Sequence, residues 1–207
     1  MLSTQSLRLR SGAKADLMFK RGFDILVSAT GIIILSPFLI FVAVLVKLTS
    51  QGPIFHRATR IGRYGEAFKL YKYRSMVINA EKMGPAVTGA NDPRITPVGS
   101  FLRRTKMDEL PQLFNVFLGD MSLVGPRPER PEHVIRLEEK IPFYRTRHVV
   151  RPGVTGWAQV RYQYGSTDED AMVKLQYDLY YIRHQSLALD VNIIIRTVGK
   201  VLRMAGV

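Results

Sequence analysis

The longest apolar stretch in the chain is ILVSATGIIILSPFLIFVAVLV, which runs from Ile25 to Val46 without a charged residue. As a straight helix rising about 1.5 Å per residue, it would extend roughly 33 Å, enough to cross the hydrocarbon core of a bilayer. The run is too long for the apolar region of a signal peptide, and no small-x-small cleavage pattern follows it. We therefore expect a membrane segment that is retained in the protein.

The middle of this run, at Ser36-Pro37, is where its helix is expected to break. A proline inside a helix removes a hydrogen bond and clashes with the preceding turn, and Ser36 is placed to satisfy a freed backbone group. Lysines and arginines flank the run on both sides, which by the positive-inside rule puts both ends in the cytoplasm. These features favour a re-entrant hairpin, and a proline-kinked spanning helix is the alternative.

The composition of the chain fits one domain and an anionic partner. Its 207 residues are 46% hydrophobic, enough for one core, and its formal net charge is +13. Such an excess of positive charge indicates nucleic acid, anionic lipid headgroups or phosphorylated substrates, and composition does not choose among them. The absence of cysteine excludes a disulfide framework and a thiolate metal site.

The sequence pattern divides the chain into a basic N-terminal segment (1–17), the re-entrant membrane hairpin (18–48) and one further domain (49–207). In that domain, two short strands joined by a glycine-bearing turn are expected at 53–62 and 66–76. The Gly-rich and Pro-rich stretch that follows is expected to be mainly loop.

Helical patterns dominate the rest of the domain. TDED at 167–170 has the form of a capped helix N-terminus. The C-terminal stretch, 186–207, carries an apolar side and a basic side, so it either lies in a membrane interface or docks on the protein's own core. One further apolar stripe at helical spacing is most simply core, and it consists of Leu110, Leu113, Phe114 and Phe117.

RRTKMDELPQLFN, residues 103–115, places two adjacent carboxylates after a group of basic residues. If Asp108 is the N-cap of a helix, Pro111 falls in the first turn, where its missing N–H has no intrahelical partner in any case. In that register the helix dipole and the nearby Arg103 and Arg104 favour the ionised form of Asp108. The non-catalytic interpretation of this stretch is a helix start whose charged side chains are solvated.

The chemistry for which these residues are suited is phosphoryl transfer. An ionised aspartate can attack phosphorus, with arginines and Mg²⁺ around the transferred group, so Asp108 is a candidate nucleophile and Glu109 a candidate Mg²⁺ ligand. Arg127, between the prolines of GPRPE, is suited to bind phosphate. RPGVTGWAQV (151–160) is suited to approach a nucleotide with its glycines and Trp157. The alternative for both loops is a turn with a solvated arginine and a buried indole.

Four motifs occur in order along the chain: KRGFD (20–24), SPF (36–38), LRRTKMDELPQLFNVFLGDMSLVGPRPE (102–129) and RPGVTGWAQV. Together they resemble the bacterial sugar transferases, the monotopic polyprenyl-phosphate phosphoglycosyl transferases, and the chain is similar to their minimal catalytic form without extra transmembrane helices. The resemblance implies a helix-rich α+β fold. It combines a re-entrant membrane helix hairpin, a small β-hairpin and amphipathic interfacial helices around one cytoplasmic catalytic domain.

The resemblance also implies a function. The family transfers a sugar 1-phosphate from a UDP-sugar to undecaprenyl phosphate and releases UMP, at the cytoplasmic face of the bacterial inner membrane. By this likeness Asp108 forms a covalent phosphosugar intermediate, Glu109 binds Mg²⁺, and Arg103 and Arg127 grip phosphate. The remaining matched residues are Lys20, Arg21, Asp24, Ser36 and Pro37 in the membrane hairpin, and Arg151, Gly153, Gly156 and Gln159 in a nucleotide or substrate loop.

One departure from the family pattern concerns the sugar. Many relatives follow GWAQV with Asn-Gly, whereas Arg161-Tyr162 stand here, as in exopolysaccharide-type members. A hexose or an N-acetylhexosamine is therefore expected, in a pathway that builds exopolysaccharide, capsule or another glycoconjugate. Anionic membrane lipids are expected partners, and a homo-oligomer is allowed.

The rival hypothesis is a non-catalytic basic membrane-surface adaptor. The net charge favours it, but the arginines occur in Pro- and Gly-fixed loops and not in an even basic patch with interleaved aromatic residues. A nucleic-acid partner is not expected, for the same reason.

Overall fold

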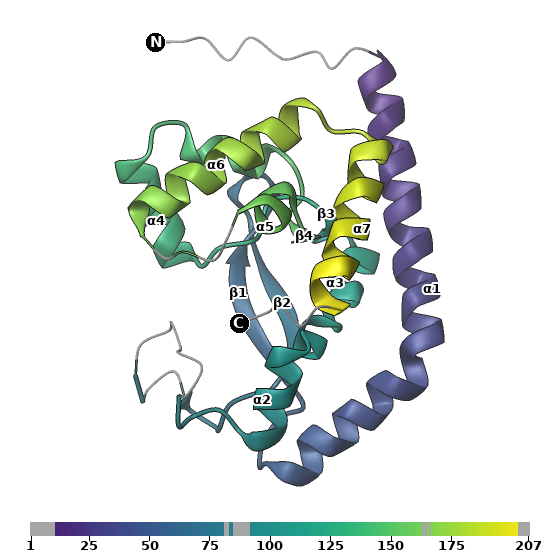
Figure 1. Ribbon diagram of the computed structural model, residues 1–207, viewed down its shortest axis with the longest axis vertical. Helices are drawn as coiled ribbons and strands as arrows, with labels where there is room; N and C mark the ends of the chain where they lie inside the picture. The colour runs from purple at the N-terminus through teal and green to yellow at the C-terminus, as the bar shows by residue number, and fades with distance from the viewer. Residues whose placement is uncertain (1–10, 81–82, 85–91, 163–164, 166, 203–207) are drawn as a thin grey trace.

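In its described part, the chain forms one long helix beside a body of shorter helices and two small sheets. The computed structural model describes residues 11–80, 83–84, 92–162, 165 and 167–202. Helix α1 (Ser11–Thr49) runs along one side of the body (Figure 1). The helix-rich α+β architecture expected from the sequence is confirmed.

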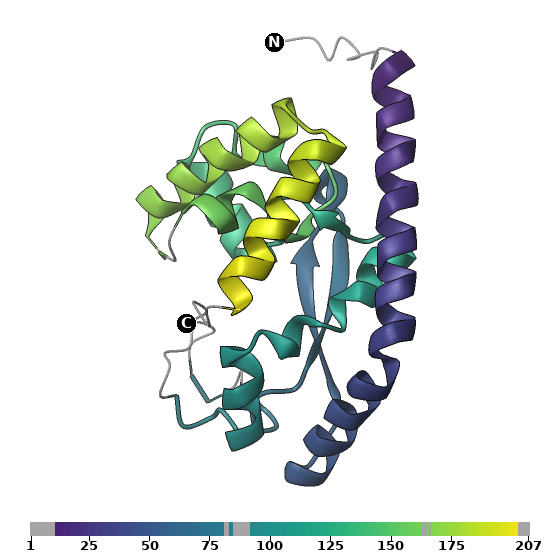
Figure 2. The same ribbon diagram turned by 45° about the vertical axis from the view of Figure 1, so that its right-hand side comes forward.

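Helix α1 continues through Pro37 and bends there instead of breaking into two helices. Its lower part is angled against its upper part in Figures 1 and 2. The Ser36 hydroxyl donates a 2.8 Å hydrogen bond to the carbonyl of Ile33, the acceptor that the missing N–H of Pro37 would have used. The predicted role of Ser36 is confirmed. The helix continues through the proline as one bent element because the serine replaces the lost donor. The re-entrant hairpin over 18–48 stays a prediction.

The start of α1 also differs from the predicted division of the chain. The helix already includes residues 11–17, which the sequence pattern assigned to a separate basic segment. Residues 1–10 of that segment lie outside the described part of the chain.

The apolar side chains of α1 are mostly not covered by the body. Among the described residues, α1 is the one helix long and apolar enough to cross a membrane, over Asp16–Thr49, and only 17% of its most apolar window is buried. The inward-facing side chains of Leu39, Val42 and Val46 pack with Tyr73 and Leu102. A core helix would be mostly buried, so the exposed apolar surface of α1 suggests membrane association.

The predicted β-hairpin is confirmed. Strands β1 (Phe55–Ile61) and β2 (Ala67–Tyr73) pair antiparallel, from Phe55 opposite Tyr73 to Ile61 opposite Ala67, around a 3₁₀ turn η1 (Arg63–Gly65). A second, parallel pair joins β3 (Ser122–Val124) to β4 (Gly153–Thr155). The sequence predicts a loop where β4 lies, since a three-residue strand shows no clear alternation.

Short helices make up the rest of the body, and α6 confirms the predicted capped start. Thr167 caps its N-terminus, and the Thr167 and Asp170 side chains form a capping box. Of the loop expected after the β-hairpin, residues 81–82 and 85–91 lie outside the described residues. The helices are α2 (Pro97–Arg104), η3 (Met107–Glu109), α3 (Gln112–Leu118), α4 (Pro131–Lys140), η4 (Tyr144–Val149), α5 (Trp157–Arg161), α6 (Asp168–Arg183) and α7 (Leu187–Leu202).

Helix α3 does not bury the apolar stripe that its sequence suggested. Phe114 and Phe117 are exposed, whereas Asn115 and Val116 are fully buried. The Asn115 side chain accepts a hydrogen bond from the N–H of Tyr71 at 2.9 Å and donates to the carbonyl of Lys69 at 2.8 Å. This polar link to β2 decides which side of α3 faces inward. The prediction that the whole stripe is core is therefore wrong.

Helix α7 is amphipathic, as expected, but a polar residue helps dock it. Asp190 and Ile193 are buried against the body, while other apolar side chains of α7, among them Val191, Ile195 and Val198, are exposed. One side of α7 thus packs on the protein, and another apolar side stays uncovered.

Candidate active site

The two adjacent carboxylates lie in a tight turn between α2 and α3. Lys106 adopts a left-handed conformation, and Asp108 and Glu109 then fall within the 3₁₀ turn η3. Pro111 is the N-cap of α3, which begins at Gln112. The predicted helix start at Asp108 is therefore wrong, because the turn closes between Met107 and Leu110 before the α-helix begins.

Glu109 is held by two basic side chains from separate parts of the chain. Its Oε1 atom accepts hydrogen bonds from Lys72 Nζ of β2 at 2.6 Å and from an Arg127 guanidinium nitrogen at 2.8 Å. Burial raises the pKa of Glu109, but the charges of Arg127 and Lys72 outweigh burial and hold the pKa well below its usual range. Glu109 is therefore ionised at any cellular pH.

Asp108 has the opposite electrostatic balance. The residue is only 7% exposed, and burial raises the pKa of its carboxyl group. The charge of Lys72 and, more weakly, that of Arg103 lower this pKa, and the neighbouring Glu109 raises it. The net shift is upward, which contradicts the expectation of a pKa lowered by arginines and a helix dipole. That expectation failed because it treated Asp108 as an exposed helix cap.

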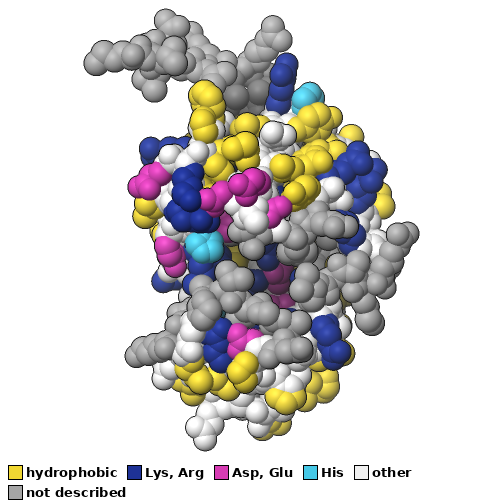
Figure 3. Space-filling model, turned by 60° about the vertical axis from the view of Figure 1, so that its left-hand side comes forward, with side chains coloured by type: hydrophobic (Ala, Val, Ile, Leu, Met, Phe, Trp, Pro, Cys, Tyr) yellow, Lys and Arg dark blue, Asp and Glu magenta, His cyan; other side chains and the backbone are white. Residues whose placement is uncertain are grey.

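Arg103 precedes the two carboxylates in the sequence, and Arg127 follows them. Arg103, in the last turn of α2, donates from Nε to the Ser75 hydroxyl at 2.8 Å. Arg127 follows β3 in a loop between two prolines. These two arginines, together with Lys72, Asp108 and Glu109, form what we call the carboxylate cluster. On the face in Figure 3, acidic and basic side chains lie together in a recess across the middle of the molecule.

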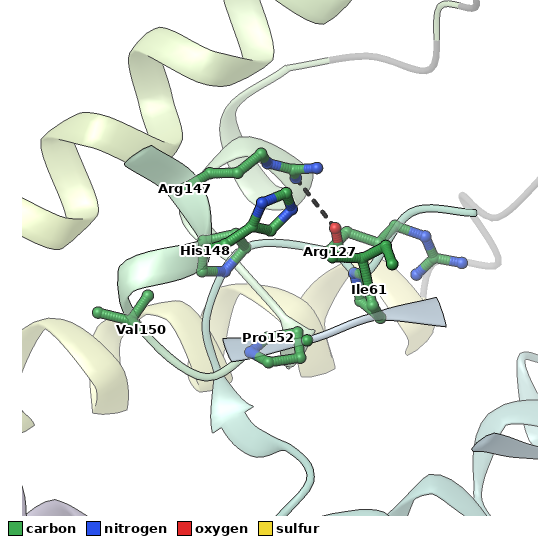
Figure 4. Close-up of a pocket in the computed structure, with 9 residues that line it drawn as sticks. Ile61, Arg127, Arg147, His148, Val150 and Pro152 are labelled. Carbon is green, nitrogen blue, oxygen red and sulfur yellow. Dashed lines mark hydrogen bonds between the residues drawn. The ribbon is translucent and has the colours of Figure 1, made fainter. Parts of the chain in front are cut away.

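The site also includes Lys72 and a support for Arg127, which the sequence does not predict. Arg147 of η4 donates to the backbone carbonyl of Arg127 at 2.9 Å, and Figure 4 shows its guanidinium pointing at that oxygen, beside His148. Arg147 is itself paired with Asp178 of α6 at 2.8 Å, and both side chains are buried. No local motif marks these residues, since the contacts join parts of the chain far apart in sequence.

The predicted nucleotide loop is not part of the carboxylate cluster. A Cβ atom on Gly153 would lie 2.1 Å from the nitrogen of Gly125, and one on Gly156 would lie 2.3 Å from the Gly125 oxygen. Close backbone packing therefore explains why glycine is needed at both positions. Gln159 donates to the Val154 carbonyl at 3.3 Å, within the same segment.

The basic residues near the start of α1 fasten that helix to the body. Lys20 pairs with Asp190 of α7 at 2.6 Å, and the Arg21 guanidinium donates to carbonyls at the end of α3. Asp24 Oδ1 accepts the N–H of Leu123 at 3.1 Å. Arg151, from the predicted nucleotide loop, lines a cleft with these three residues.

The donor set of the carboxylate cluster fits a Mg²⁺ ion that arrives with a phosphorylated substrate. Among the described residues, no group of three or more His, Cys, Asp and Glu side chains is placed to hold a metal. Mg²⁺ typically takes one or two carboxylates and completes its shell with water and substrate phosphates. Asp108 and Glu109 offer that number of carboxylates.

The buried Asp108 and the partly buried Glu109 lie among basic side chains, beside a long apolar helix. These features define the class: a membrane-associated protein with a site suited to phosphate groups. The chain belongs to the bacterial sugar transferase family, whose model matches residues 15–204. The resemblance found in the sequence motifs is thereby confirmed.

Similar curated proteins carry transferase names. The chain is 45% identical over 183 residues to the UDP-N-acetylgalactosamine-undecaprenyl-phosphate N-acetylgalactosaminephosphotransferase of Aeromonas hydrophila, covering 88% of this chain and 43% of that protein. It is 44% identical over 186 residues to the UDP-glucose:undecaprenyl-phosphate glucose-1-phosphate transferase of Escherichia coli K12, covering 88% and 40%. The chain thus spans less than half the length of these two relatives.

A third relative has nearly the same extent as this chain. The exopolysaccharide production protein PSS of Rhizobium leguminosarum bv. phaseoli is 47% identical over 193 residues, covering 88% of this chain and 94% of the relative. The matched region is therefore the part shared by long and short members.

Proposed function

We propose that the protein transfers a sugar 1-phosphate from a UDP-sugar to undecaprenyl phosphate, with release of UMP, and so begins a glycoconjugate such as an exopolysaccharide or capsule. The observation that carries this proposal is the buried Asp108 next to a Glu109 that Lys72 and Arg127 hold in place. The names of similar proteins support the two substrates.

Asp108 is the nucleophile in this proposal. Its carboxylate oxygen forms a bond to the sugar-bearing phosphorus, and the bond from that phosphorus to the bridging oxygen breaks, so UMP leaves with the bridging oxygen. An oxygen of undecaprenyl phosphate then attacks the same phosphorus and restores the free carboxylate. Burial suits this role, because a desolvated carboxylate is a stronger nucleophile once it is ionised.

The basic side chains act by charge and position. Arg103 and Arg127 bind phosphate oxygens through guanidinium groups, and Lys72 offsets negative charge near both carboxylates. Glu109 is the residue that would hold Mg²⁺. When bound, the ion neutralises charge on the diphosphate.

A UMP-release assay tests the proposal. Purified protein is incubated with undecaprenyl phosphate, Mg²⁺ and each of several UDP-hexoses and UDP-N-acetylhexosamines. We expect UMP with at least one sugar, and a loss of about 10³-fold or more in Asp108→Asn, as for removal of a nucleophile. The exposed Asp16→Asn carries the same chemical change away from the site and should keep full activity.

Two outcomes would contradict the proposal. An adaptor without activity would release no UMP with any sugar. Full turnover by Asp108→Asn would exclude a covalent route through this residue, even if the transfer itself occurred.

Glu109→Gln tests the proposed Mg²⁺ ligand. Replacing the carboxylate by an amide should raise the Mg²⁺ concentration that gives half-maximal UMP release, because a neutral amide oxygen is a weaker ligand. Mg²⁺ titrations of the two proteins at one UDP-sugar concentration measure the effect. Superimposable titrations would remove Glu109 from the set of ligands.

We further propose that α1 inserts as a re-entrant helix at the cytoplasmic face of the bacterial inner membrane. Both ends of its apolar run are tied to one body: Lys20 and Asp24 through buried contacts, and Thr49 through the strand that follows it. A spanning α1 would carry those charged contacts or the attached body into the hydrocarbon, which is costly. The bend at Pro37 and the basic flanks support insertion from one side.

A further inference from the structure

A second group of basic side chains lies where the start of α1 meets the body. A cleft there is lined by Arg21 and Asp24 of α1, by Arg63 of η1 and by Arg151, which precedes β4. No member of the carboxylate cluster lines this cleft. The cleft is therefore a separate feature from the proposed active site.

The three arginines of the cleft are held by neutral acceptors. Arg21 donates to the carbonyls of Val116 and Phe117 at 2.6 and 2.9 Å. Arg151 donates from Nε to the Gly119 carbonyl at 2.9 Å, and Arg63 from Nε to the Val149 carbonyl at 3.2 Å. Within the described part of the chain, none of the three guanidinium groups forms an ion pair. Each is therefore held in place by a carbonyl oxygen that carries no net charge.

These charges are close enough to repel one another. A Cβ atom on Gly119 would lie 3.3 Å from an Arg21 nitrogen, and the carbonyl of this same Gly119 holds Arg151. Burial lowers the pKa of Arg151, and the charges of Arg21 and Arg63 lower it further. Among the described residues that line the cleft, Asp24 is the one carboxylate, and its charge raises the pKa of Arg151. An anion between the arginines would relieve the repulsion.

We propose that this cleft binds a phosphate group through Arg21, Arg63 and Arg151. Guanidinium groups present paired N–H donors that match phosphate oxygens, and three converging guanidiniums exceed what a single carboxylate neutralises. The site is additional to the proposed phosphate contacts of the carboxylate cluster, and it stands whether or not that cluster transfers a sugar phosphate.

The position of the cleft favours a lipid headgroup as the source of the phosphate. Its residues on α1 end at Asp24, and the apolar run begins at Ile25. If that run is buried in a bilayer, the cleft lies at the depth of the phospholipid phosphates. A free phosphate or a soluble phosphate ester is the other source with the same chemistry.

Calorimetric titration of inorganic phosphate into the full chain tests the site. The protein is kept in dodecyl maltoside at constant ionic strength and carries Arg127→Gln, which weakens competing binding at the carboxylate cluster. We expect Arg63→Gln to weaken phosphate binding by about tenfold, the scale of one charge-assisted hydrogen bond. Arg161→Gln is the matched control and should change nothing, because Arg161 is exposed on α5 and stacks on Trp157.

Arg63 is the least disruptive of the three arginines to replace, since its hydrogen bond to Val149 is exposed. Thermal unfolding of both variants checks that the fold is kept. Arg63→Lys supplies a second test: it retains the charge but not the paired donors, so its phosphate affinity should fall between those of the parent chain and Arg63→Gln.

A competition arm identifies the source. Short-chain phosphatidylglycerol that displaces phosphate from the parent chain, but not from Arg63→Gln, would assign the site to a lipid headgroup. Phosphate binding that depends on Arg63 and resists the lipid would assign it to a soluble phosphate. Equal phosphate affinity in Arg63→Gln and Arg161→Gln, or no phosphate binding in the Arg127→Gln chain, would overturn the proposal.

Discussion

Asp108 and Glu109 are neighbours in the sequence, yet their surroundings shift their pKa values in opposite directions. Burial dominates at Asp108 and raises its pKa, while Arg127 and Lys72 overcome burial at Glu109 and lower its pKa. Two carboxylates whose environments separate their pKa values in this way are suited to different roles. The residue scale therefore supports a nucleophile at Asp108 and a permanently charged partner at Glu109.

Because the pKa of Asp108 is raised, the rate of its attack on phosphorus should fall at low pH. We call this fall the acid limb of the pH–rate profile. Attack requires the carboxylate, so the burst of UMP in the first turnover should fall as the pH drops through this pKa. Of the charges that lower the pKa of Asp108, that of Lys72 has the largest effect. Lys72→Met removes this charge and should move the acid limb to higher pH. The measurement is the burst rate against pH in rapid-quench experiments.

The control for this pH profile lies on the same strand. Lys69 is exposed and donates to the Thr59 hydroxyl, so Lys69→Met removes an equal charge away from Asp108. Its acid limb should match that of the parent chain. An unchanged limb in Lys72→Met would show that Asp108 does not control the burst.

At the scale of elements, the loop that carries Arg127 depends on helices far along the chain. Arg147 of η4 holds the Arg127 carbonyl, and Asp178 of α6 holds Arg147 through a buried pair. Gly125 in the same loop packs against β4 at distances that only glycine permits. Arg127 is thus positioned by contacts that its own short motif does not contain.

Asp178→Asn should destabilise the protein by about 3–5 kcal/mol, because it leaves the buried charge of Arg147 without a counter-charge. Asp168→Asn is the matched control. Asp168 pairs with Arg136 and Lys140 near the surface, where solvent screens the charges, so Asp168→Asn should destabilise the protein far less. Urea unfolding in detergent measures both, and similar losses in the two variants would contradict a special role for the Arg147–Asp178 pair.

At this scale, local sequence signals predict some elements and not others. The β1–β2 hairpin and the capped start of α6 were predictable, because glycine in a turn and a Thr-x-x-Asp cap act within a few residues. The start of α3 was not, since the left-handed Lys106 and the 3₁₀ turn after it have no distinct sequence signature. The short parallel pair β3–β4 was missed because it joins segments about 30 residues apart.

At the scale of the whole molecule, α1 and the body form one unit. The body contacts α1 from Lys20, which pairs with α7, to Val46, which is buried in a core with Tyr73 and Leu102. The exposed apolar side chains of α1 lie on the surface that this packing leaves uncovered, and they include Leu26, Ile33, Ile34, Ile40 and Phe41. This arrangement favours insertion of one side of α1 with both ends at the same membrane face.

Labelling of single cysteines tests this topology. The chain has no cysteine, so Asp16→Cys and Gln51→Cys each introduce one exposed thiol, near the two ends of the apolar run. We expect an impermeant maleimide to label both in inside-out vesicles and neither in spheroplasts. Ile34→Cys, within the apolar run, is the control that should be shielded in both preparations. Labelling of residues 16 and 51 from opposite sides would establish a spanning helix.

The sequence by itself determined the apolar helix, its weak point at Ser36-Pro37, the β-hairpin and the pairing of Asp108 with Glu109 near arginines. These are local features, fixed by composition and spacing over a few residues, and the ordered motifs sufficed to indicate the family. The tertiary structure alone decided that Lys72 reaches Glu109, that burial raises the pKa of Asp108, and that Arg21, Arg63 and Arg151 share a cleft. The physical reason is that burial and charge proximity depend on which distant segments pack together, and spacing along the chain does not specify that packing.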